Sequence, residues 1–340
     1  MNKSTKPFIG IIILEYNNVK DTIECIDSVL NSDYENYMIV LVDNASKMRY
    51  FTELNELYGL NEKISLIRTP KNGGFGYGNN AGMKYLENFN PKYFLILGND
   101  TIIEENTISK LLNHIENNDR IGIVVPKVLL FETKKTNRIN SLGGNFCKFG
   151  FANDRFFGQK IHEIADIDNN FFYAPGSCFL VREEIAKKIN YFDENIFLYW
   201  EDVDFSWRTR LIGFDIQIVP ESLIYHKLST STGRKKNAFK VYNREFSWLY
   251  VIIKNLSLKN IIKFLPVYII FMFAKVIFNS KNKEHFRAII AAYLKFFVTL
   301  KENIKQHKGV QQKRKIDDKE ILCLSNNGAM KQSIFYRDQG

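Results

Sequence analysis

Four short apolar runs alternate with helical patterns through the first 126 residues of this chain. The runs cover residues 8–14, 38–42, 64–67 and 93–97, and a fifth covers residues 121–126. Helical patterns follow the first four runs at about residues 19–30, 49–58, 78–88 and 105–117. The first run is apolar on both faces, which is typical of a central parallel strand. This alternation predicts an α/β fold with a mostly parallel sheet and helices on both faces.

A polar cluster ends each of the first four runs, at residues 15–18, 43–46, 71–76 and 98–100. Ligands of such sheets bind beyond the carboxyl ends of the strands, so four polar clusters at one edge predict a binding site there. Asp43 is suited to accept hydrogen bonds from a base or a ribose. It is equally suited to an Asx-turn or to the cap of the next helix.

Two of these clusters suggest how an anionic ligand could be held. Residues 72–80 (NGGFGYGNN) are rich in glycine and open a helix, which lets backbone N–H groups approach an anion. They match neither GxGxxG nor the P-loop. Asp100 follows Gly98 and Asn99. It suits a helix cap, or a divalent cation that needs few protein carboxylates because substrate phosphates supply the other ligands.

Two adjacent carboxylates, Glu201 and Asp202, follow an aromatic run and begin a predicted helix. Acidic side chains are favoured there by the helix dipole, and a carboxylate in a cleft is also a candidate general base. Val203, Trp207 and Leu211 share the buried face of this helix by their spacing.

The same helix has a predicted ion pair and a predicted end. Asp204 and Arg208 are spaced as an i, i+4 pair, and Gly213 is placed as the residue that ends the helix. A strand at residues 214–218 is expected to stop at Pro220, and His226 follows it. A single histidine there is either a hydrogen-bonded structural residue or a ligand.

The net charge of +10 is distributed unevenly. Residues 254–315 hold 14 Lys or Arg against two Glu, so the first 253 residues are near neutral. A basic block inside an apolar segment predicts an anionic membrane surface as partner, and no nucleic acid. Four scattered cysteines indicate no disulfide framework. The apolar run at residues 8–14 is too short for a signal peptide, which predicts the cytosol or the cytoplasmic face of the cell membrane.

The C-terminal third contains three helical segments, at residues 242–255, 261–278 and 286–300. Lys263 and Lys275 interrupt the segment at 261–278, and Lys295 interrupts the segment at 286–300. Pro266 is expected to kink the segment at 261–278. Neither offers about 20 nearly uncharged residues, so we expect interfacial helices that make the protein peripheral. The alternatives are helices packed on the catalytic domain or on a second subunit of a homodimer, and a spanning hairpin. Residues 306–340 are predicted to be a flexible polar tail.

Seven motifs in order make residues 7–250 resemble the inverting glycosyltransferases of family 2, which have the Rossmann-like GT-A fold, and most closely their rhamnosyltransferase-like branch. The motifs are IIILEYNN, VDNAS, NGGFGYGNNAG, LGNDT, APGSCFLVREEI, YFDENIFLYWEDVDFSWRTRLIGF and the closing His226. The resemblance implies a GT-A catalytic domain at residues 1–250, with nucleotide-sugar binding at about 7–126 and acceptor and base regions at about 127–250. Membrane-associating helices at 251–305 and the tail at 306–340 complete the expected organisation.

The resemblance also implies roles for individual residues. Asp202 would be the general base, with Glu201 beside it in the catalytic pair. The nucleotide-sugar would be held by Tyr16, Asn17, Asp43, Asn72, Gly73, Gly74, Phe75, Asn79 and Asp100. A divalent metal, Mg²⁺ or Mn²⁺, would be held by Asp100 and His226. The acceptor would face Gly176, Ser177 and Trp200.

The implied reaction moves a sugar, with rhamnose as the candidate, from a dTDP- or UDP-sugar to a glycan or lipid-linked acceptor in cell-surface polysaccharide or glycoconjugate assembly. One base and a separate phosphate-binding set suit inverting transfer, whereas a retaining hydrolase needs two carboxylates that flank one bond. Gly98 stands where the family's metal motif has its first carboxylate, and Glu15 stands where an uncharged residue is usual. Gly98 therefore keeps open a catalytically idle nucleotide-binding or scaffold protein. A nucleotidyltransferase is a weaker alternative.

Overall fold

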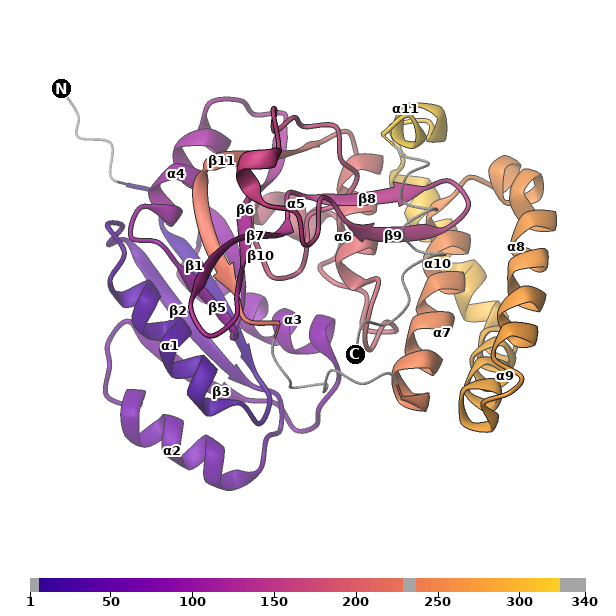
Figure 1. Cartoon of the computed structure of the whole chain (residues 1–340). Helices are drawn as coiled ribbons and strands as arrows, with labels where there is room; N and C mark the ends of the chain where they lie inside the picture. The colour runs from indigo at the N-terminus through magenta and orange to yellow at the C-terminus, as the bar shows by residue number, and fades with distance from the viewer. Residues whose placement is uncertain (1–5, 229–236, 325–340) are drawn as a thin grey trace.

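The chain folds into an α/β catalytic region followed by a group of C-terminal helices (Figure 1). A computed structural model describes residues 6–228 and 237–324. The predicted alternation is confirmed, because each of the first four long strands is followed by a helix. These elements are β1 (Ile9–Glu15), α1 (Val19–Leu30), β2 (Tyr37–Asp43), α2 (Met48–Tyr58), β3 (Ile64–Arg68), α3 (Phe75–Leu86), β4 (Tyr93–Gly98) and α4 (Thr107–Glu116).

The remaining elements complete the sheet and add the helical region. The later strands are β5 (Thr101–Ile103), β6 (Ile121–Phe131), β7 (Lys135–Ser141), β8 (Gly144–Cys147), β9 (Phe151–Asp154), β10 (Cys178–Arg182) and β11 (Asp215–His226). The helices are α5 (Glu183–Lys188), α6 (Glu201–Leu211), α7 (Ala238–Asn255), α8 (Leu258–Phe278), α9 (Lys283–Val298), α10 (Leu300–Lys313) and α11 (Asp318–Leu322), with short 3₁₀ turns η1 (Glu87–Phe89) and η2 (Ile161–Glu163).

The central sheet has the order β3-β2-β1-β4-β10-β6-β11-β5, with β7 paired to β6. β1, β2, β3 and β4 are parallel, whereas β10 runs antiparallel to both β4 and β6. Ile11 and Ile13 of β1 belong to the core that includes residues of α1, α2 and α4, and Ile12 belongs to the core that includes residues of α3 and α6. Successive strand side chains point to opposite faces, which is why the first run is apolar throughout.

β11 continues past Pro220, so the prediction that the strand stops there is wrong. Its register against β6 shifts between Val219 and Leu223, and pairing resumes up to His226. Proline lacks a backbone N–H but is tolerated at a bulge, where the ladder is already interrupted. The extension brings His226 opposite Thr101 of β5.

The C-terminal segments pack on the catalytic region more closely than the sequence indicated. α7 crosses the expected boundary at residue 250 without a break. Residues 306–324 were expected to be a flexible tail, but they end α10 and form α11. Arg314 pairs with buried Asp318, and Ile316 N–H donates to Leu211 O at the end of α6. Residues 325–340 of the predicted tail lie outside the described residues.

Among the described residues, α8 is a helix long and apolar enough to cross a membrane by length and composition. We expected residues 261–278 not to offer about 20 nearly uncharged residues, but the helix begins at Leu258, contains Pro266 without ending there, and meets the length and composition of a spanning helix. Only Phe264 and Tyr268 of α8 are buried.

Candidate active site

A cavity of about 830 Å³ opens at the carboxyl edge of β1 and β4, beside the first turn of α6. All four predicted polar clusters contribute to its wall. The wall includes Tyr16, Asn44, Asn72, Gly74, Phe75, Gly98, Asn99, Asp100, Asn140, Asp154, Gly176, Ser177, Trp200, Glu201, Asp202, His226 and Arg244. The cavity therefore joins residues from most of the length of the catalytic region.

The glycine-rich loop forms one side of this cavity. The Asn72 Oδ1 accepts hydrogen bonds from Asn44 Nδ2 at 3.1 Å and from Gly74 N at 3.0 Å. Gly74 has φ +90°, and a Cβ there would lie 2.1 Å from the carbonyl oxygen of Phe197. The loop can approach the segment before α6 only because residue 74 is glycine. Phe75 N–H also donates to that carbonyl.

Four residues predicted to bind the nucleotide-sugar lie behind this wall. The buried carboxylate of Asp43 pairs with Arg68 and accepts from Ser46 N at 3.1 Å. The structure thus places Asp43 in the support of the loops, outside the cavity wall, and its direct contact with the nucleoside stays a prediction. The other three also bond to the chain: Asn17 Oδ1 accepts from Lys47 N, Gly73 N donates to Asn44 Oδ1, and Asn79 Nδ2 donates to Phe75 O.

Glu15 also supports the site from behind. It is fully buried, and it accepts hydrogen bonds from Asn18 N, Thr22 Oγ1 and Asn99 Nδ2. Burial raises the pKa of its carboxyl group, and the hydrogen bonds act against that shift. Its departure from the usual uncharged residue therefore has a structural explanation, because it anchors Asn99 immediately before Asp100.

Asp100 and His226 come together at the edge of β5. The His226 Nε2 lies 3.2 Å from Asp100 Oδ1, and its Nδ1 lies 2.9 Å from Asn140 Oδ1. Burial acts to lower the pKa of His226, but the Asp100 carboxylate raises it above its ordinary value. When Nδ1 donates its proton to Asn140 Oδ1, Nε2 is the ring nitrogen that faces Asp100 Oδ1.

This pair fits a divalent cation that takes only two protein ligands. The described residues contain no group of three or more His, Cys, Asp or Glu side chains placed to hold a metal ion. Gly98 supplies no ligand, and a Cβ there would lie 3.2 Å from Asp100 Oδ1 and 3.3 Å from Ser177 O. Glycine thus lets β10 approach β4 beside Asp100, and a diphosphate would complete the metal coordination.

Glu201 and Asp202, the predicted catalytic pair, lie at the start of α6, after two residues with left-handed backbone. Tyr199 has φ 65° and Trp200 has φ 72°, which is uncommon for large side chains and occurs mostly at functional sites. The Asp202 Oδ2 accepts from Gly176 N at 3.0 Å, and its Oδ1 accepts from Val203 N at 2.8 Å. The predicted acceptor turn at Gly176 therefore also holds Asp202.

Glu201 and Asp202 differ in the hydrogen bonds that reach their carboxyl groups. Burial raises the pKa of both, but two backbone N–H groups favour the charged form of Asp202. Among the described residues, Glu201 Oε2 has no hydrogen-bond partner, and the neighbouring Asp202 raises the pKa of Glu201 further. Of the two, Glu201 retains its proton to higher pH, which leaves the negative charge on Asp202.

Asp154 is a cavity residue that the sequence did not single out. It ends β9, opposite Gly144 in the β8–β9 hairpin. Burial and the nearby Asp202 raise its pKa to about 7. Residues 131–170 show no clear period, so only the hairpin pairing brings this carboxyl group to the cavity. Asn140 was not predicted as a cavity residue either, because it lies in the same stretch without a clear period.

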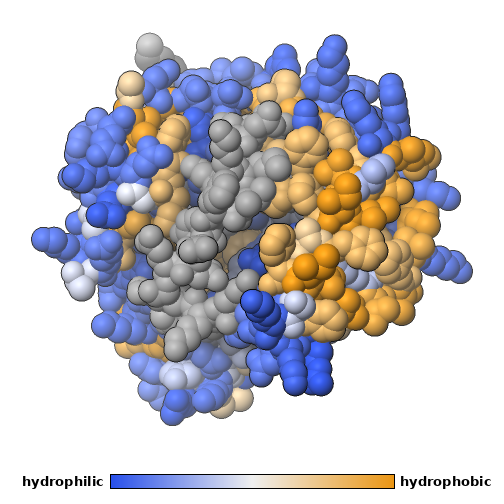
Figure 2. Space-filling model, turned by 45° about the vertical axis from the view of Figure 1, so that its right-hand side comes forward, coloured by the Kyte–Doolittle hydropathy of each residue, from blue (hydrophilic) through white to orange (hydrophobic). Residues whose placement is uncertain are grey.

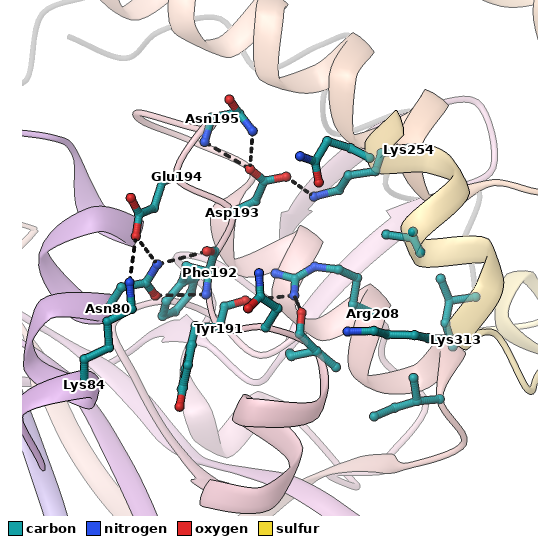
Figure 3. Close-up of a pocket in the computed structure, with 17 residues that line it drawn as sticks. Asn80, Lys84, Tyr191, Phe192, Asp193, Glu194, Asn195, Arg208, Lys254 and Lys313 are labelled. Carbon is teal, nitrogen blue, oxygen red and sulfur yellow. Dashed lines mark hydrogen bonds and ion pairs between the residues drawn. The ribbon is translucent and has the colours of Figure 1, made fainter. Parts of the chain in front are cut away.

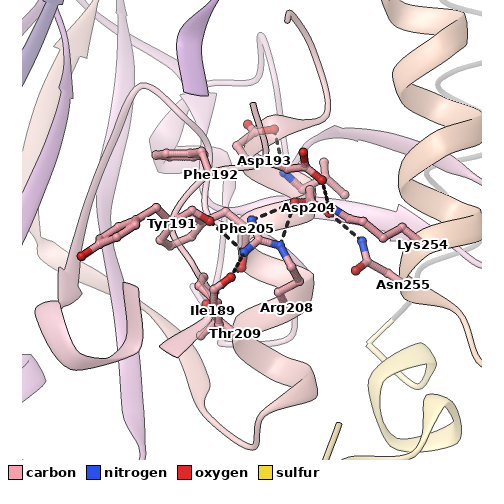
Figure 4. A network of polar contacts seen from close by, with 12 residues as sticks. Ile189, Tyr191, Phe192, Asp193, Asp204, Phe205, Arg208, Thr209, Lys254 and Asn255 are labelled. Atoms are coloured by element: carbon pink, nitrogen blue, oxygen red, sulfur yellow. Dashed lines mark hydrogen bonds and ion pairs between the residues drawn. The ribbon is translucent and has the colours of Figure 1, made fainter. Parts of the chain in front are cut away.

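A second cavity, of about 430 Å³, lies between α6, α7 and α10 (Figure 3). Its charged walls are mostly paired. Lys254 contacts Asp193 at 2.5 Å and Asp204 at 2.7 Å, and Arg208 contacts Asp204 at 2.8 Å (Figure 4). The predicted Asp204–Arg208 pair is thus confirmed, and the cavity belongs to the support of α6.

The fold and this site together define a glycosyltransferase of the GT-A type, in which an α/β sheet edge carries a carboxylate-histidine pair in the same cavity as the two carboxyl groups that begin α6. The glycosyl transferase family 2 model matches residues 10–190, and the chain belongs to this family. It is 27% identical over 236 residues to the low-salt glycan biosynthesis hexosyltransferase Agl10 of Haloferax volcanii, covering 69% of this chain and 72% of that protein. It is 24% identical to the rhamnosyltransferase WbbL of Escherichia coli, covering 71% and 89%.

Solved structures agree on the fold. GalNAc-T7, determined with UDP, GalNAc and Mn²⁺, superposes with a TM-score of 0.60 at 15% identity, over 73% of this chain and 48% of that one. The mannosyltransferase PcManGT from Pyrobaculum calidifontis, in complex with GDP-Man and Mn²⁺, has a TM-score of 0.52 at 11% identity, over 98% and 88%. The predicted α/β GT-A class and the prediction of a glycosyltransferase enzyme are confirmed.

Proposed function

We propose that this glycosyltransferase moves a hexose, with rhamnose as the candidate, from a dTDP- or UDP-sugar to a hydroxyl of a glycan or lipid-linked acceptor by a single inverting displacement. The acceptor would belong to cell-surface polysaccharide or glycoconjugate assembly. The observation that carries the proposal is the position of Asp202. Two backbone N–H groups orient its carboxylate in the same cavity that Asp100 and His226 enter.

Asp202 acts as the general base. Its carboxylate takes the proton of the acceptor hydroxyl as that oxygen forms a bond to the anomeric carbon. The bond between the anomeric carbon and the diphosphate oxygen breaks in the same step, and the nucleoside diphosphate leaves with the bonding electron pair. Glu201 stays neutral beside Asp202, so the pair carries one negative charge.

Asp100 and His226 would hold the divalent cation, Mg²⁺ or Mn²⁺, together with the donor diphosphate. When bound, the cation neutralises the charge that develops on the leaving diphosphate. Asn140 orients His226, and Glu15 with Asn99 positions the Asp100 segment. The loop at Asn72, Gly74 and Phe75 contacts the donor, and Gly176, Ser177 and Trp200 face the acceptor. These assignments rest on shared lining of one cavity.

The test compares Asp202→Asn with wild type, using release of UDP or dTDP from a panel of nucleotide-sugars with a membrane lipid extract as acceptor. We expect Asp202→Asn to lose on the order of 10²–10⁴-fold in rate, the usual range for a general base. Calorimetric titration with UDP and dTDP, with and without Mn²⁺, should remain as in wild type.

Two results would overturn the assignment. Wild-type turnover by Asp202→Asn would show that another group is the base. A greater loss in Glu201→Gln than in Asp202→Asn would transfer the role to Glu201. Nucleotide binding by the wild-type protein without transfer across the panel would favour the binding-only alternative that Gly98 suggests.

A further inference from the structure

One face of α8 exposes an unbroken stripe of large apolar side chains. Figure 2 shows this hydrophobic surface as one area on the side of the molecule that carries the C-terminal helices. Its most exposed members, Ile262, Ile270, Phe273 and Ile277, are 64–67% exposed, and Leu265 and Ile269 lie between them. We call this set the α8 stripe. Contiguous apolar surface of this kind on a folded domain marks an interaction site.

The opposite face of α8 is fixed to the catalytic region along its length. Tyr268 Oη donates to Lys148 O at 3.0 Å, and Lys275 Nζ lies 2.7 Å from Glu245 Oε2. Phe264 and Phe271 pack against rings at the tip of the β8–β9 hairpin. These four α8 residues are spaced by four, three and four positions, so they form a second stripe on the other side of the helix.

The contacts of α8 with the β8–β9 hairpin and with α7 limit how the helix can contact a bilayer. A spanning helix would carry the attached hairpin, the Lys275–Glu245 pair and part of α7 into hydrocarbon, where charged groups are costly. A helix that lies in the interface buries only its outer stripe and leaves the attached face in contact with the protein. The geometry therefore favours α8 lying flat.

The charges around the stripe point to the chemistry of the partner. Exposed basic side chains flank it on α8, on α9 and in the turn between them, whereas Glu284 is the one exposed acid on these described helices and that turn. The exposed basic side chains are Lys259, Lys263, Lys281, Lys283, Arg287 and Lys295. Long basic side chains beside an apolar helix face suit anionic head groups above an acyl-chain boundary.

We propose that the α8 stripe inserts into the interface of an anionic lipid bilayer and holds the enzyme there without spanning it. The β8–β9 hairpin links this surface to the active site, because its tip contacts α8 while Asp154 at its end lines the cavity. A bilayer on the stripe is thus separated from a wall element of the site only by the thickness of α8. If the proposed function holds, this favours the lipid-linked acceptor over the soluble glycan.

The test is co-sedimentation of the full chain with vesicles of phosphatidylglycerol and phosphatidylcholine, or of phosphatidylcholine alone. The variant Ile262→Glu/Phe273→Glu/Ile277→Glu replaces three stripe residues that are 64–67% exposed. Leu57→Glu is the matched control, because Leu57 is 55% exposed on α2. We expect the triple variant to lose roughly tenfold or more of its affinity for the anionic vesicles, with Leu57→Glu unchanged.

Binding by wild type should be weaker on phosphatidylcholine alone and should fall with salt. Alkaline carbonate should release wild type from membranes. Unchanged vesicle binding by the triple variant would overturn the proposal, and so would resistance to carbonate, which would indicate a spanning helix. Light scattering that shows a wild-type dimer, a monomeric variant and no vesicle binding would assign the stripe to a second copy. None of these readouts depends on transfer activity, so they fail or succeed separately from the proposed function.

Discussion

The Nζ of Lys254 in α7 lies 2.7 Å from the Oδ1 of Asp204 in α6, and both side chains are buried. The same ammonium group lies 2.5 Å from Asp193 Oδ2, and Asn255 also donates to Asp204 (Figure 4). Asp204 is two residues after the proposed base, on the same helix. The first C-terminal helix therefore holds α6 through buried charges, and α7 is part of the same folded unit.

Replacing Lys254 should destabilise the whole protein. Lys254→Met leaves the Asp193 carboxylate without a cation and leaves Asp204 with Arg208 alone, and we expect the free energy of unfolding to fall by about 3–5 kcal/mol. Lys84→Met is the control, because Lys84 and Glu194 form an exposed pair at 3.5 Å that is worth less than about 1 kcal/mol. Urea unfolding followed by circular dichroism measures both. Equal losses in the two variants would contradict the prediction.

The Lys254 bridge should also depend on pH in a defined direction. Burial acts to raise the pKa of Asp193, but Lys254 lowers it below its ordinary value. A lowered folded-state pKa gives stability that is complete above the unfolded value near 3.9 and is lost as the pH falls below it. The difference in the free energy of unfolding between wild type and Lys254→Met should therefore become smaller below about pH 4. A constant difference from pH 7 to pH 3 would refute this.

Asp154 should make the wild-type protein less stable at high pH. Its folded pKa is raised to about 7, so the neutral form favours folding, and this contribution is lost as the pH rises from about 4 through 7. The side chain in Asp154→Asn cannot ionise. The free energy of unfolding of this variant, relative to that of wild type, should therefore rise by on the order of 1–3 kcal/mol between pH 5 and pH 8. Parallel pH profiles of the two proteins would argue against a buried carboxyl group here.

Asn140 should affect metal affinity through its hydrogen bond to His226, without contacting the metal itself. Its Oδ1 lies 2.9 Å from His226 Nδ1, and loss of such a partner typically weakens metal affinity by roughly 10–100-fold. Asn140→Leu should raise the Mn²⁺ concentration needed for half-maximal transfer by that factor. Its maximal rate at saturating Mn²⁺ should change less. An unaltered Mn²⁺ titration would remove His226 from the proposed metal site.

Gly74→Ala should disrupt donor binding. The new Cβ would lie 2.1 Å from Phe197 O, so the loop and the segment before α6 must separate. Gly158→Ala is a matched control, since Gly158 also has positive φ but no atom lies within 4 Å of the place that its Cβ would take. We expect UDP and dTDP affinity to fall only in Gly74→Ala, while both variants lose about 1 kcal/mol of stability from backbone strain. Equal nucleotide affinity in the two would contradict the role of this close approach.

Local periodicity predicted much of this fold. The four βα units, the helix from Glu201 and its end at Gly213 follow from side-chain spacing and from glycine's tolerance of positive φ, which is 94° at Gly213. These features depend on neighbours within a few residues, so a single sequence contains them. The polar clusters at the strand ends were predictable for the same reason, because parallel strands present their carboxyl ends at one edge.

The tertiary structure decided which polar side chains reach the cavity. Asp43 and Asn79 lie outside the cavity wall, whereas Asp154 and Asn140 line the cavity. The pairing of β7 with β6 and of β8 with β9 sets the positions of the last two. Pro220 did not end β11, since the neighbouring β6 holds both sides of a bulge. For the opening βα pattern, sequence alone was sufficient. The environment of Asp202, and the side of α8 that faces outward, arise from contacts between segments far apart in the chain, which no local pattern encodes.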